Sequence, residues 1–188
     1  MSGFTAVGFF LIGSLFGIIT LTLWVRIALR YYRISTLNQF SQMIYSLTDP
    51  VLNPINRLFK IQLRKYDWIC FAVLVLMEFL KIICLSLLVF SKIIPFPYLC
   101  IYVIADLIIQ PLNLLFYAII IRVVMSYTNP NWRHPVADFL YTITEPLFVL
   151  GRRIVPDISG FDFSPFIMMM ILKMITLFIS NSLPWRIL

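Results

Sequence analysis

Four long apolar runs divide the chain. They lie at residues 4–25, 68–90, 99–121 and 163–183. Each is of the length that a helix needs to cross roughly 30 Å of hydrocarbon. The pattern therefore predicts an all-α, polytopic membrane protein with four transmembrane helices.

The segments 26–67 and 122–162, between these runs, mix polar and apolar residues at helical spacing. Four apolar residues of the first segment fall at positions i, i+3, i+4 and i+7: Phe40, Met43, Ile44 and Leu47. The second segment repeats the stripe with another four: Val136, Phe139, Leu140 and Ile143. An apolar stripe on an otherwise polar helix is typical of a helix that lies in the membrane interface.

The sequence also repeats itself. The stretch LTDPVLNPINRLF at 47–59 matches ITEPLFVLGRRIV at 143–155, with every position shifted by 96, and the register extends back to Arg26 and Arg122. A repeat of this length indicates two copies of one supersecondary unit. We therefore expect two parallel helix–interfacial loop–helix repeats, residues 1–92 and 99–188, related by an axis along the membrane normal.

Composition and charge agree with a membrane protein and indicate its orientation. The chain is 61% apolar and 12% charged, with a net charge of +7 and a mean hydropathy of +0.95. Of its 15 Lys and Arg residues, eleven lie in the two interfacial loops. The positive-inside rule then predicts cytoplasmic loops and both termini outside. We expect contact with anionic lipid headgroups and no binding of nucleic acid.

A hydroxyl, an acid and a proline recur in each loop, as Thr48-Asp49-Pro50 and Thr144-Glu145-Pro146. Hydroxyl and carboxylate groups cap helices, and proline suits a first helical turn. We therefore expect one interfacial helix to end and another to begin at each site. Arg57 and Arg153 are expected to reach toward lipid phosphates.

Other polar residues stand at or within the spans. Asp162 and Ser164 precede Pro165 and are expected to cap the fourth span. Four ionisable residues fall inside spans: Glu78, Lys81, Asp106 and Lys173. Glu78 and Lys81 share a helix face and can neutralise each other. The set is interpreted as a helix-locking ion pair or, alternatively, as a relay for ions.

Enzymatic and cofactor chemistry is not indicated. His134 is the single histidine, and Asn38 occupies its place in the first repeat, so a symmetric haem or zinc site within one chain is disfavoured. No nucleophile with a base, no metal-ligand cluster and no phosphate loop is evident. We therefore predict a protein that is not an enzyme and has no cofactor.

The repeated motif and the stretch GRRIVPDISGFDFSP at 151–165 resemble the YggT family of small bacterial inner-membrane proteins, which extends to YlmG and chloroplast relatives. The second repeat has Leu150 in place of Pro54, and the first retains only Asp67 as a counterpart of the later motif. The signature residues are Thr48, Asp49, Pro50, Pro54, Arg57, Thr144, Glu145, Pro146, Arg152, Arg153, Pro156, Gly160, Asp162, Ser164 and Pro165.

The resemblance implies a role in envelope processes: osmotic-stress tolerance, division or membrane organisation and, in chloroplast relatives, cytochrome b haem maturation. Because the signature lies in the loops, we predict a scaffold or assembly factor of the bacterial inner membrane, with a membrane-protein partner or self-association. The alternatives are a small ion-transport or osmotic-response channel component and a haem maturation factor.

Overall fold

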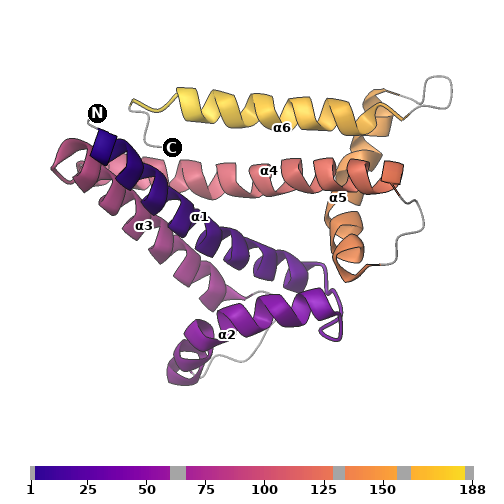
Figure 1. Cartoon of the computed structure of the whole chain (residues 1–188), viewed down its shortest axis with the longest axis horizontal. Coiled ribbons are helices and arrows are strands. Elements are labelled where there is room, and N and C mark those ends of the chain that lie inside the picture. The colour runs from indigo at the N-terminus through magenta and orange to yellow at the C-terminus, as the bar shows by residue number, and fades with distance from the viewer. Residues whose placement is uncertain (1–2, 60–66, 129–133, 156–161, 185–188) are drawn as a thin grey trace.

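The computed structural model describes residues 3–59, 67–128, 134–155 and 162–184, and in these ranges every regular element is a helix (Figure 1). The helices are α1 (Gly3–Tyr31), α2 (Gln39–Phe59), α3 (Trp68–Phe90), α4 (Phe96–Thr128), α5 (Pro135–Ile154) and α6 (Ser164–Asn181). Four of them, α1, α3, α4 and α6, are long and apolar enough to cross a membrane. The expected all-α membrane protein with four spanning helices is confirmed.

Two spans continue beyond the apolar runs that predicted them. The first run ends at Val25 and the third at Ile121, yet α1 continues to Tyr31 and α4 to Thr128. Arginine is a good helix former, and the arginine that follows each run is held by partners on the next helix. A charge at the end of an apolar run therefore does not end these helices.

The expectation that Thr-acid-Pro separates two interfacial helices is wrong. α2 passes through Pro50 and Pro54, and α5 passes through Pro146. A proline removes one backbone hydrogen bond and kinks a helix without necessarily ending it. Figure 1 shows α2 bent along its length. The threonine hydroxyls do not cap: Thr48 donates to the carbonyl of Ile44 at 2.8 Å.

The apolar stripes of the two interfacial helices differ in how far they are buried within the protein. Ile44 of α2 is buried, but Met43 and Leu47 are exposed. Their counterparts in α5, Phe139 and Ile143, are buried. The apolar stripe of the first repeat is therefore split between the protein and its surroundings, whereas that of the second packs largely into the protein.

The spans pair within each half of the sequence. α1 packs along α3, α4 packs along α6, and contacts between α3 and α4 join the halves. Figure 1 shows α2 and α5 at one end of the bundle, with the start of α1 and the end of α6 at the opposite end. The two interfacial helices contact each other there, and the Asn38 side chain donates to the Pro135 carbonyl at 3.0 Å.

Candidate functional site

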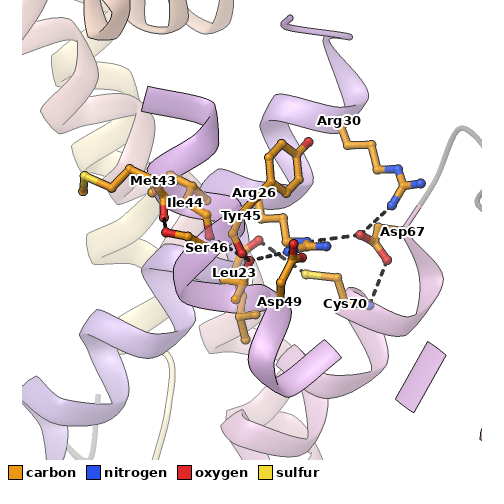
Figure 2. Close-up of polar contacts among 11 residues, drawn as sticks. Leu23, Arg26, Arg30, Met43, Ile44, Tyr45, Ser46, Asp49, Asp67 and Cys70 are labelled. Atoms are coloured by element: carbon orange, nitrogen blue, oxygen red, sulfur yellow. Dashed lines mark hydrogen bonds and ion pairs between the residues drawn. The ribbon is translucent and has the colours of Figure 1, made fainter. Parts of the chain in front are cut away.

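The junction between α1 and α2 centres on Arg26 (Figure 2). Its guanidinium donates to the Thr48 hydroxyl and, at 2.6 Å, to the Asp49 carboxylate. It also donates to Asp67 at 3.3 Å, and Arg30 donates to the same Asp67 oxygen at 2.8 Å. Two arginines and two carboxylates thus join the end of the first span to α2 and to the start of α3.

The centre of this first junction is closed to solvent, whereas the Asp49 side chain at its edge is 39% exposed. Arg26 is 4% exposed, as is the Asp67 side chain. The Arg26 guanidinium lies 4.8 Å from the centroid of the Tyr45 ring. Burial raises the pKa of the Tyr45 hydroxyl. The second Asp67 oxygen accepts from the Cys70 amide at 3.3 Å and so caps α3. Charges removed from water require such partners on all sides.

The same contacts recur 96 residues later. Arg122 of α4 donates to the Thr144 hydroxyl at 2.8 Å and to the Glu145 carboxylate at 2.6 Å. Its guanidinium lies 4.6 Å from the Tyr141 ring centroid and 4.1 Å from that of Phe148. The Thr-acid pair of each repeat is therefore the acceptor for an arginine at the end of the preceding span.

The second junction differs in its outer charges. Asp162 accepts from the Arg152 guanidinium at 3.0 Å and from the Ser164 amide at 2.8 Å. Burial alone would raise the pKa of Asp162, but these hydrogen bonds and the Arg152 charge lower it. Ser126 stands at the position that Arg30 has in the first repeat. The second arginine is therefore carried by the span in one half and by the interfacial helix in the other.

A separate polar cluster joins α3 to α4 near the middle of α3. Lys81 pairs with Glu78 at 3.2 Å and with Asp106. Gln110 donates to Glu78 and, at 3.3 Å, to Asp106. Lys173 of α6 does not join this ion pair among the described contacts. It lies 5.6 Å from the Phe116 ring centroid and lines a cavity of about 340 Å³ with Lys81 and Asp106.

The remaining predicted residues are more scattered. Pro50, Pro54 and Pro146 lie inside helices, and Pro165 lies in the first turn of α6. Arg153 is exposed on α5. Pro156, Gly160 and the Arg57 side chain lie outside the described residues.

Sequence reasoning missed Arg26, Arg122 and Asp67 as members of these junctions. The signal available was the position of both arginines at the start of the gap-free register, each 22 residues before its threonine.

Comparison with known proteins assigns the chain to a family. The sequence model of the CCB3/YggT family matches residues 5–88 and 101–183. The chain belongs to the CCB3/YggT family. Each matched stretch contains one complete junction, the first with Arg26, Thr48 and Asp49 and the second with their counterparts.

Relatives of this CCB3/YggT-family chain are similar over nearly their whole length. The protein YggT of Escherichia coli K12, itself uncharacterized, is 28% identical over 177 residues, which cover 93% of this chain and 89% of the relative. An uncharacterized protein of Pseudomonas aeruginosa is 27% identical over 97% of this chain and 93% of its own. An uncharacterized protein of Vibrio alginolyticus is 30% identical over 82% of this chain and 83% of the relative. No solved structure gives a significant match.

Proposed function

We propose that this CCB3/YggT-family protein is a non-enzymatic scaffold or assembly factor of the bacterial inner membrane, without a cofactor. Its two interfacial helices face the cytoplasm, contact anionic headgroups and present a surface to a membrane-protein partner or a second copy. Both termini are outside, as the concentration of basic residues in the loops favours. The process served is osmotic-stress tolerance, division or membrane organisation.

One observation carries the proposal. Each interfacial helix is fastened near its midpoint to a spanning helix, through Thr48 in α2 and Thr144 in α5. A helix held at its middle keeps its orientation, and a preorganised surface loses less entropy when a partner binds. Both helices also expose apolar side chains: Met43, Leu47 and Val51 on α2, and Val149, Leu150 and Ile154 on α5.

The test is photocrosslinking in cells. A photoreactive residue replaces Ile154, which is 59% exposed on α5, or Met43, which is 56% exposed on α2. The matched control replaces Phe10, which is 69% exposed on α1 at the other end of the bundle. We expect one identified envelope protein, or a second copy, from the two interfacial positions and not from Phe10. Recovery of lipid alone from both interfacial positions would contradict the proposal.

Ion transport is a second candidate, favoured by the cavity among the spans. Side chains from α1, α3, α4 and α6 line it, and they include Lys81, Asp106, Asn113 and Lys173. Ionisable residues inside a membrane protein often mark ion or proton pathways. Purified protein in liposomes should then carry a flux that is lost when Lys81, Asp106 and Lys173 are replaced by neutral residues.

A further inference from the structure

The two junctions differ in what completes the coordination of their central arginine. Arg26 binds Thr48, Asp49 and a third acceptor, Asp67. Arg122 has only Thr144 and Glu145 as acceptors within the described part of the chain. The counterpart of Asp67, Asp162, turns to Arg152 instead. The second junction therefore lacks the third acceptor that the first junction supplies from its own chain.

A cavity of about 680 Å³ opens beside Arg122. Three charged residues line it, Arg122, Arg152 and Asp162. Glu145 pairs with Arg122 at 2.6 Å and with Arg152 at 4.0 Å but does not line the cavity, so the lining itself carries a net charge of +1. Most of the remaining wall is apolar or aromatic and includes Phe148, Phe163, Phe166 and Met169. One further lining residue is Ser126, at the position where the first repeat has Arg30. A small side chain at this position leaves the space open.

The location of the cavity indicates what can enter. α4 has 33 residues and is therefore about 50 Å long, well beyond the roughly 30 Å of hydrocarbon. Arg122 directly follows the apolar run at 99–121 and contacts α5, so it is expected at the level of the headgroups. Phe166, on the first turn of α6, is exposed and continues the wall toward the lipid-facing side of that span.

We propose that the cavity binds one anionic phospholipid. Its phosphate takes the place at Arg122 that Asp67 takes at Arg26, and Arg152 donates from the other side, as arginine does to phosphate in bidentate sites. An acyl chain lies against Phe163, Phe166 and Met169. The inference rests on the proposed position of α5 at the membrane surface, and it adds a defined lipid site to that function.

The test is lipid retention by the purified full-length protein, read by native mass spectrometry after delipidation and addition of dioctanoyl phosphatidylglycerol. We expect one bound molecule per chain. Ser126→Arg places the arginine of the first repeat in the cavity, which Asp162 also lines, and should lower occupancy at least fivefold. Ser46→Arg adds the same charge at an exposed site on α2 and should leave occupancy unchanged. Should Ser126→Arg fail to fold, Ser126→Trp fills the same space without charge.

Three results would overturn the assignment. One is equal occupancy in the filled variants and the wild type. Another is equal retention of dioctanoyl phosphatidylethanolamine, which would remove the anionic preference. The third is displacement of the lipid by millimolar inorganic phosphate, which would assign the cavity to a free phosphate ligand. A bound lipid without a crosslinked protein would support the lipid site and contradict the scaffold function. A crosslinked protein without a bound lipid would support the scaffold function and contradict the lipid site.

Discussion

Arg122 in α4 donates a hydrogen bond to the hydroxyl oxygen of Thr144 in α5 at 2.8 Å. The same hydroxyl donates its proton to the carbonyl of Leu140 at 2.6 Å. Thr144 therefore acts as donor and acceptor at once, and it is fully buried. A hydroxyl at this point is needed for the junction because a methyl group of the same size can play neither role.

Thr144→Val should lower the free energy of unfolding by about 1–3 kcal/mol, because the buried Arg122 loses an acceptor while the shape of the residue is kept. Thr142→Val in the same helix is the control. Within the described residues Thr142 donates only to the carbonyl of Asp138, so its replacement should change stability by less than about 0.5 kcal/mol. Thermal unfolding in detergent measures both. Equal melting temperatures for the two variants would contradict the role given to Thr144.

Replacement of Arg26 should lower the free energy of unfolding more than replacement of Arg122 does. Arg26→Met leaves the buried carboxylate of Asp67 with Arg30 alone, and breaking a buried ion pair costs about 3–5 kcal/mol. Arg122→Met leaves Glu145, which is about half exposed to solvent, and should cost about 1–2 kcal/mol. Arg153→Met, at an exposed position of α5, is the control. Chemical denaturation of the three proteins gives the order, and a larger loss for Arg122→Met would refute it.

The fold was largely readable from the sequence, because lipid imposes a simple rule on the spans. A run of apolar residues long enough to cross the bilayer must be helical, since its backbone groups find no water there. The span of 68–90 therefore coincides with α3, Trp68–Phe90. The ends of α1 and α4 were not readable in this way. They depend on where Arg26 and Arg122 find their acceptors, 22 and 23 residues further along the chain.

The candidate site could be predicted from the sequence only in part, because contacts between helices decide the roles of its residues. Local rules gave Thr48 and Thr144 the role of helix caps, but a tertiary partner, the arginine, decided their role instead. The predicted cap of the fourth span is only partly right. Asp162 accepts from the Ser164 amide, but the residue at the N-cap of α6 is Phe163 and Ser164 is the first residue of the helix. The exchange of Arg30 for Arg152 between the halves required three-dimensional contacts to recognise.

Close packing of α5 on α6 depends on Gly151. A Cβ atom at this position would lie 2.7 Å from the Ser164 Cβ and 3.1 Å from the Ser164 carbonyl oxygen. Gly151→Ala should therefore destabilise the protein by about 1–3 kcal/mol, because the backbone of α6 must move. Gly17→Ala is the matched control, since no atom lies within 4 Å of a Cβ there. Thermal unfolding that is identical in the two variants would contradict the packing.

Sidedness can be measured with single cysteines in a variant that lacks Cys70, Cys84 and Cys100. Met43→Cys and Asp138→Cys, both exposed on the interfacial helices, should be protected from a membrane-impermeant maleimide in intact cells and labelled in inverted vesicles. Lys92→Cys, exposed between α3 and α4, should react in intact cells. The opposite pattern would reverse the orientation that the basic residues predict.

Substitutions in the cluster of Glu78, Lys81 and Asp106 can distinguish a structural ion pair that locks the helices from an ion pathway. Lys81→Met leaves two buried carboxylates without their cation and should cost about 3–5 kcal/mol. The triple variant Glu78→Gln, Lys81→Met, Asp106→Asn removes all three charges and should recover most of that stability, because no unpaired charge stays buried. If the cluster is only a lock, the triple variant keeps the crosslinked partner of the interfacial helices. Loss of a liposome ion flux in this folded triple variant, with flux retained in Lys92→Met, would instead favour transport over the scaffold.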